Sequence, residues 1–165
     1  MALVVGLIGC SGVDLAAGAE LKPGVWTWGV GFGFLKDTPD GTALALNANV
    51  EALVLPGLSV GPLMQLGFTG DSAQFGLSGQ VKYWIDIPGT EKRLKVTPQA
   101  GIGFVHNSHR DGDTSFLIPI GAGADYALSD KLSVTGTLLI NFTDLDTGKK
   151  SGADVMPGFT IGVRF

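Results

Sequence analysis

The sequence has one cysteine, few charged residues and no long apolar run. A single Cys among 165 residues cannot form an internal disulfide. Charged residues make up only 16% of the chain, which argues against a disordered protein. No window holds about eighteen consecutive apolar residues, so the sequence predicts no transmembrane helix. The net charge of -4 offers no basic surplus, and we therefore expect no binding to nucleic acid.

Glycine and alternating apolar residues are abundant instead. The chain contains 26 glycines, and its mean hydropathy is +0.33. High hydropathy without a long apolar run is typical of membrane β-strands, because only every second residue of such a strand must be apolar.

Residues 25–34, VWTWGVGFGF, show this alternation most clearly. Large apolar residues occupy the even positions from Trp26 to Phe34, and three of the odd positions are glycine. A period of two predicts a β-strand. A strand on a soluble core would direct polar or charged side chains to water, whereas this one presents glycine on its second face. We therefore expect the large face to contact lipid and the small face to line a narrow barrel.

The same alternation recurs along the chain, separated by polar turns. Each segment has about eleven residues, which is enough to cross a bilayer when the strand is tilted. The sequence therefore predicts an all-β fold, an eight-stranded antiparallel up-and-down transmembrane β-barrel. The predicted strands are 25–34, 44–54, 58–69, 74–85, 94–105, 115–126, 132–142 and 155–165.

The distribution of charge indicates which face is outside. No charged residue falls on the large apolar face, and five fall on the small face. A water-facing surface typically contains about 25–35% charged residues, so the small face fits a lumen better than an exterior. We predict that the five charges pair and plug the lumen; the alternative is a narrow ion path. The five residues are Glu51, Lys82, Lys95, Asp125 and Arg164.

Outward aromatic residues gather at the two ends of the predicted strands, as they do at the two interfaces of a bilayer. Those expected near one set of loops are Phe34, Phe68, Phe75, Phe104, Phe116 and Phe142. Those expected near the opposite ends are Trp26, Tyr83, Tyr126 and Phe165.

These features, together with the ending GFTIGVRF, resemble the small eight-stranded outer-membrane β-barrel proteins of Gram-negative bacteria. The resemblance implies an integral outer-membrane location, contact with the bilayer and lipopolysaccharide, and recognition of the last strand by the barrel-assembly machinery. The residues that match this assembly signal are Phe159, Ile161, Val163 and Phe165. It also implies external loops at 36–41, 70–73, 106–113 and 144–154. It identifies no protein partner.

The first nineteen residues differ from the rest. They begin with a short apolar run, and Ala17-Gly18-Ala19 has the small-x-small form of a signal-peptidase site, so we expect 1–19 to be an export signal and 20–165 the barrel. Leu7-Ile8-Gly9-Cys10 also resembles a bacterial lipobox, which would make Cys10 a lipidation site.

Candidate chemistry is sparse. His106, Ser108 and His109 resemble the His-x-Ser pair of lipid A deacylases, but no outward strand position supplies the carboxylate that would orient the histidine. The pairs Asp111 with Asp113 and Asp144 with Asp146 could hold a divalent ion, although neither follows a full calcium-loop pattern. We predict no cofactor, no metal site and no enzymatic activity. The predicted role is structural support or surface interaction through short loops; the alternatives are a lipid-modifying enzyme and a small passive channel.

Overall fold

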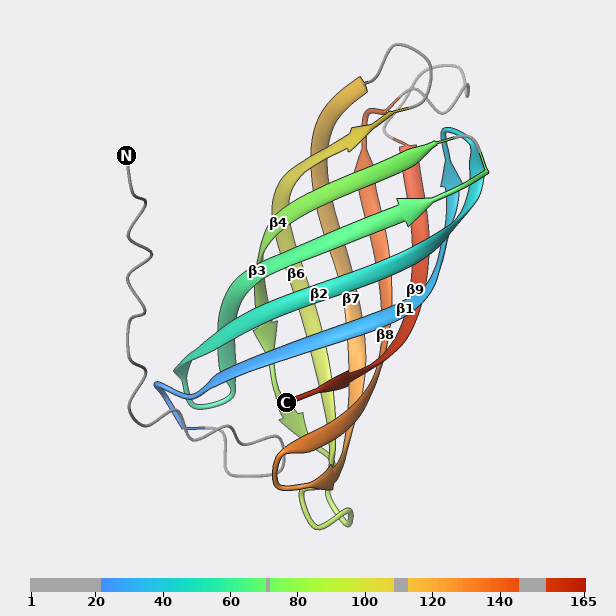
Figure 1. The fold of residues 1–165 in the computed structure, drawn as a ribbon. Coiled ribbons are helices and arrows are strands. Elements are labelled where there is room, and N and C mark those ends of the chain that lie inside the picture. Colours follow the sequence, from blue (N-terminus) through green and yellow to red (C-terminus); the bar gives the residue numbers. More distant parts are fainter. Residues whose placement is uncertain (1–21, 71, 109–112, 146–153) are drawn as a thin grey trace, which may run out of the picture.

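The computed structural model describes residues 22–70, 72–108, 113–145 and 154–165, which form a closed antiparallel β-barrel (Figure 1). The predicted export signal, Cys10, His109, Asp111 and Asp146 lie outside these residues. None of the described residues belongs to a helix long and apolar enough to span a membrane. The strands are β1 (Trp26–Thr38), β2 (Gly41–Leu55), β3 (Leu58–Phe68), β4 (Ala73–Tyr83), β5 (Ile85–Asp86), β6 (Leu94–Asn107), β7 (Asp113–Ser129), β8 (Leu132–Thr143) and β9 (Asp154–Arg164).

The barrel closes on itself without a free edge. The sheet runs β4-β3-β2-β1-β9-β8-β7-β6-β5, and β4 also pairs with β6. Because β5 continues β4 after an interruption at Trp84, the two segments form one barrel strand, and the barrel has eight strands in all. Every pairing is antiparallel, which confirms the predicted fold class.

Exposure alternates along the strands as the sequence predicts. Trp26 and Phe32 of β1 are 50% and 64% exposed, whereas Thr27 between them is 1% exposed. No outward position between the two groups of aromatic residues carries a charge within the described residues. The exterior is therefore apolar and suited to lipid, and the polar side chains are enclosed.

Several strands are longer than predicted. β1, β2 and β7 contain 13, 15 and 17 residues, so the hairpins continue past the aromatic residues into segments that the sequence analysis assigned to turns. Backbone pairing between two antiparallel strands does not require an apolar face. Hydrophobic alternation therefore could not reveal these extensions.

Tight contact between strands explains several glycines of the small face. A Cβ at Gly33 would overlap the carbonyl oxygen of Phe159 in β9, and one at Gly103 would overlap that of Leu77 in β4. Glycine permits the strong bending that an eight-stranded barrel demands, because it removes the side chain at the point of closest approach.

The two ends of the barrel differ. We call the end that holds Trp26, Phe165 and the turns at 55–58, 86–94 and 129–132 the terminal end. We call the end that holds the connections at 38–41, 68–73, 107–113 and 143–154 the loop end. At the terminal end Trp28 and Phe165 exchange two backbone hydrogen bonds, and their rings stack with centroids 4.4 Å apart.

Candidate functional site

Glu51 is the centre of a polar cluster inside the terminal end of the barrel. It lies on β2 and is 2% exposed, because its position in the alternation points into the lumen. Lys82 of β4 lies 2.5 Å from Oε1 of Glu51 and forms an ion pair with it. Asn49 Nδ2 donates to the same oxygen, and Ser59 Oγ donates to Oε2 at 2.8 Å. The buried carboxylate is thus paired and hydrogen-bonded, as burial of a charge requires.

Trp84 completes this cluster. Its ring centroid lies 4.1 Å from the Arg164 guanidinium and 5.6 Å from Lys82 Nζ, and its Nε1 donates to Ser59 Oγ at 2.9 Å. Arg164 in turn forms an ion pair with Asp125. Trp84 falls within the predicted strand 74–85 in phase with Lys82, and therefore on the small face, but its role was not predicted. The sequence contained an indication of this role, because a Trp side chain that points into a narrow lumen must fill much of the space around it.

Lys95 lies opposite Asp125 in the pairing of β6 with β7, but its ion pair is with another residue. It forms an ion pair with Asp86 of β5, whose side chain is 48% exposed at the rim of the terminal end. The structure therefore groups the predicted lumen charges as Glu51 with Lys82, Asp125 with Arg164, and Lys95 with a residue that the sequence analysis assigned to a turn.

Apolar side chains pack together inside the loop end of the barrel, so the interior is not uniformly polar. Val105, Leu117 and Met156 are completely buried, and Leu145, just beyond β8, is 1% exposed. The sequence analysis assigned most of these residues to the small face but did not predict that they would pack together. Sequence alternation reveals the face of a residue, not its height in the barrel. The cluster comprises Leu35, Ala43, Ala45, Val105, Leu117, Leu145 and Met156.

Two small cavities lie inside the barrel, between the charged cluster of the terminal end and the apolar cluster of the loop end. The first has a volume of about 40 Å³ and is lined by Glu51, Gln80 and Arg164 among others. The second has a volume of about 10 Å³ and is lined by Gln74 and Asn141 among others. A water molecule needs a cavity volume of about 10–15 Å³, so the first cavity has room for about three waters. Asn47, Thr137, Leu139 and Thr160 line both cavities, so the two lie next to each other in the lumen.

The predicted interface aromatics lie outward at the ends where the sequence analysis expects them. At the loop end, Phe34, Phe75 and Phe104 are 41%, 36% and 44% exposed, and the last two rings contact each other at 6.1 Å. Phe68 and Phe116 are exposed there to a similar degree, and Phe142 is half-buried. At the terminal end, Trp26, Tyr83 and Tyr126 are about half exposed, and Phe165 is half-buried.

The side chains of His106 and Ser108 each form a hydrogen bond with a residue other than the proposed catalytic partner. His106 Nδ1 shares a hydrogen bond of 2.8 Å with Thr114 Oγ1, and Ser108 Oγ accepts one of 2.9 Å from the backbone N–H of Ala73. Asp113 and Asp144 lie at the same end. Among the described residues, no group of three His, Cys, Asp or Glu could hold a metal ion. The geometry of the described atoms therefore offers no activated serine.

No protein-family model matches the sequence, and no curated protein does. Solved structures match the fold. Neisserial surface protein A is 11% identical with a TM-score of 0.61, and the match covers 84% of this chain and 94% of that one. The N-terminal β-barrel domain of Pseudomonas aeruginosa OprF is 14% identical with a TM-score of 0.60, covering 85% and 97%. A de novo designed transmembrane β-barrel is 18% identical with a TM-score of 0.50, covering 89% and 98%. At these identities the likeness is one of fold, and this chain has the fold of the eight-stranded outer-membrane barrels.

Proposed function

We propose that this protein is an integral outer-membrane barrel of a Gram-negative bacterium with a non-catalytic role, either structural support of the membrane or surface interaction through its external loops. The observation that carries the proposal is the packing of side chains at both ends of the lumen. Charged residues around Trp84 occupy the terminal end, and apolar residues around Leu117 occupy the loop end. Because the described residues pack at both ends of the lumen and assemble no catalytic cluster, we infer that the protein acts through its exterior and its loops.

The orientation follows from the fold and the resemblance. The loop end faces outward toward lipopolysaccharide, and the terminal end faces the periplasm. The aromatic residues at the two ends mark the two interfaces. The last strand, with Phe159, Ile161, Val163 and Phe165 in the outward phase, carries the signal for the assembly machinery. In this proposal the pairs Glu51–Lys82 and Asp125–Arg164 serve to fill and rigidify the lumen.

The role is tested by deleting the gene and complementing the strain with three versions of the protein. These are the wild type, Ser108→Ala, and a variant in which 144–154 is replaced by a short turn. We expect the deletion to increase sensitivity to detergent, and Ser108→Ala to restore resistance fully. A purely structural role predicts that the shortened-loop variant also restores it, whereas a role in surface interaction predicts that it does not.

Two results would contradict the proposal. One is a change in the lipid A mass profile on deletion that Ser108→Ala fails to reverse, which would indicate an enzyme. The other is stepwise current through planar bilayers containing the purified wild-type protein, at a level comparable to a larger porin measured alongside. A closed lumen predicts no such current.

A further inference from the structure

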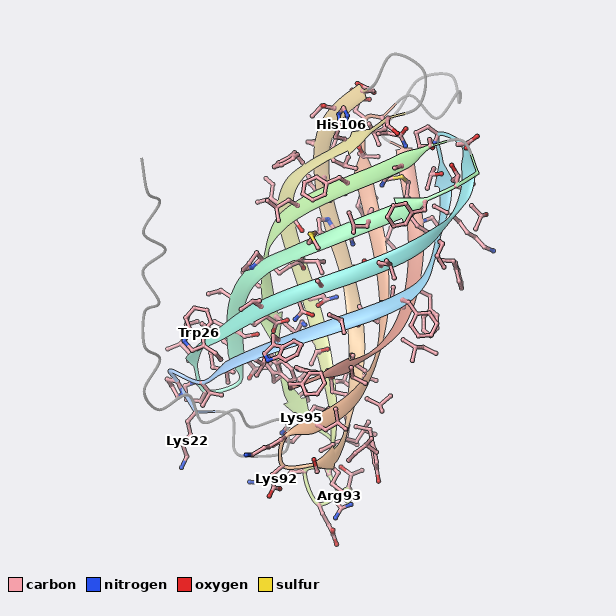
Figure 2. All side chains as sticks on the ribbon, in the orientation of Figure 1. Lys22, Trp26, Lys92, Arg93, Lys95 and His106 are labelled. Carbon is pink, nitrogen blue, oxygen red and sulfur yellow. The ribbon has the colours of Figure 1, made fainter. Side chains whose placement is uncertain are left out.

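The turn between β5 and β6, residues 87–93, carries charged side chains at the terminal end. Figure 2 shows Lys92 and Arg93 at this end, opposite the end that holds His106. The turn lies directly beside the outward surface, because Leu94, the first residue of β6, is paired with Tyr126 of β7. Its side chains are therefore placed at the boundary between the apolar exterior and water.

The turn has a defined and strained backbone. Glu91 and Lys92 have φ values of 51° and 62°, in the left-handed region that residues other than glycine seldom adopt. Hydrogen bonds hold this conformation: Arg93 N donates to Thr90 O at 2.9 Å, and Thr90 Oγ1 donates to Ile87 O at 2.7 Å. Ala127 N donates to Arg93 O, which ties the turn to β7. Strain that neighbouring bonds maintain is often found at binding sites.

An open depression lies against this turn. Its volume is about 490 Å³, and it is broadly open to solvent, so it is a surface recess and not an enclosed cavity. A Cβ at Gly89 would meet no atom within 4 Å, so nothing packs over that part of the turn. The depression is lined by Gly89, Thr90, Glu91, Arg93 and Tyr126.

The depression presents one carboxylate and one guanidinium that are not paired with each other. The ion pairs formed within the described residues join Lys82 with Glu51, Lys95 with Asp86, and Arg164 with Asp125; Glu91 and Arg93 take part in none of these. Opposite charges on one wall suit a ligand that itself carries both charges. A purely anionic ligand would be repelled by Glu91.

The depression also lies at the level where lipid headgroups are expected. Tyr126, which lines it, is 46% exposed, and Leu128 on the same strand is 54% exposed. Exposed Tyr side chains of a membrane barrel lie at the bilayer interface, with the hydroxyl near the headgroups. A phospholipid whose chains cover the outward face of β6 and β7 would thus place its headgroup against the turn.

We propose that the depression binds the headgroup of a phospholipid that carries a primary ammonium group, namely phosphoethanolamine. Arg93 pairs with the phosphate, since a guanidinium forms two parallel hydrogen bonds to phosphate oxygens. Glu91 accepts hydrogen bonds from the ammonium. A choline headgroup has no N–H to donate, and a glycerol headgroup leaves Glu91 facing an uncompensated negative charge. The inference rests on the transmembrane fold and not on the proposed role of the loops.

Native mass spectrometry of the detergent-purified protein tests this proposal with three lipids of matched chains: phosphatidylethanolamine, phosphatidylcholine and phosphatidylglycerol. We expect the wild type to bind phosphatidylethanolamine most tightly, by about fivefold over each of the others, since one exposed ionic contact contributes up to about that factor. Arg93→Gln should weaken all three. Glu91→Gln should weaken phosphatidylethanolamine and strengthen phosphatidylglycerol, which is a reversal of preference that loss of structure cannot produce.

Lys131→Gln is the matched control, because Lys131 is an exposed cation in the turn between β7 and β8 at the same end of the barrel and does not line the depression. It should bind as the wild type does. Soluble glycerophosphoethanolamine should displace the lipid only weakly, since it lacks the chains that cover the outward face. The proposal is overturned if Arg93→Gln and Glu91→Gln behave like Lys131→Gln, if the wild type prefers phosphatidylglycerol, or if the soluble headgroup competes as well as the lipid.

Discussion

At the scale of single residues, burial decides what each charge does. Glu51 is enclosed and receives hydrogen bonds from Asn49, Ser59 and Lys82. Asp86 also pairs with a lysine, but it lies half exposed at the rim. A buried ion pair leaves a costly unpaired charge when one partner is removed, whereas an exposed pair contributes little because water replaces the partner.

Glu51→Gln is therefore expected to lower the free energy of unfolding by about 3 kcal/mol, because Lys82 then loses its carboxylate inside the lumen. Asp86→Asn is the control and should lower it by no more than about 1 kcal/mol. Both values can be measured by urea unfolding of the barrel in lipid vesicles. Equal effects of the two substitutions would show that the lumen around Glu51 is as well hydrated as the rim.

At the scale of elements, glycine position determines how closely two strands approach. Gly103 of β6 faces the lumen where the backbone of β4 leaves no room for a Cβ, and Gly136 of β8 faces outward with no atom within 4 Å of a Cβ. The two residues are indistinguishable by composition. They differ in the face of the barrel that they occupy and in how closely a neighbouring strand approaches them.

Gly103→Ala is expected to destabilise the barrel by about 1–3 kcal/mol, because β4 or β6 must shift to admit the methyl group. Gly136→Ala is the matched control and should change stability by less than about 0.5 kcal/mol. The fraction that migrates as folded barrel in unheated gel samples, followed across a urea series, measures the difference. A neutral Gly103→Ala would mean that the strands have more room than the structure shows.

At the scale of the whole molecule, the strands are inverted relative to those of a soluble protein, because their polar side chains face the interior and their large apolar side chains face outward. Leu138, in the middle of β8, and Leu128, near the terminal end of β7, are each 54% exposed. In water the two positions would be equivalent. In a bilayer they differ in depth, and the cost of a charge depends on depth.

Leu138→Arg is accordingly expected to destabilise the folded barrel in vesicles by about 2–4 kcal/mol, and Leu128→Arg by about 0–1 kcal/mol. The measurement is urea unfolding in vesicles, followed by the fluorescence of the exposed Trp residues. If both substitutions proved neutral, the outward face would not be in contact with hydrocarbon, and the membrane-spanning assignment would be wrong.

The sequence could not predict the interior to the same extent as the exterior. It correctly assigned Glu51, Lys82, Asp125 and Arg164 to one face, but the partner of each charge depends on which strands meet across the lumen. The stacking of Arg164 on Trp84 across the barrel shows this plainly. Lys95 shows a different limit, since its partner Asp86 faces it on the neighbouring strand, in a segment that was predicted to be a turn.

The sequence by itself determined the class of fold, the number of strands and which side chains face lipid, because a period of two is a local property that each strand records separately. Tertiary structure alone decided how the interior is arranged, with charged residues at one end and Leu117, Met156 and Leu145 at the other. It also placed Glu91, Arg93 and Tyr126 around one depression. The physical reason is that the height of a residue in a closed barrel depends on strand tilt and register, which only the complete ring of hydrogen-bonded strands defines.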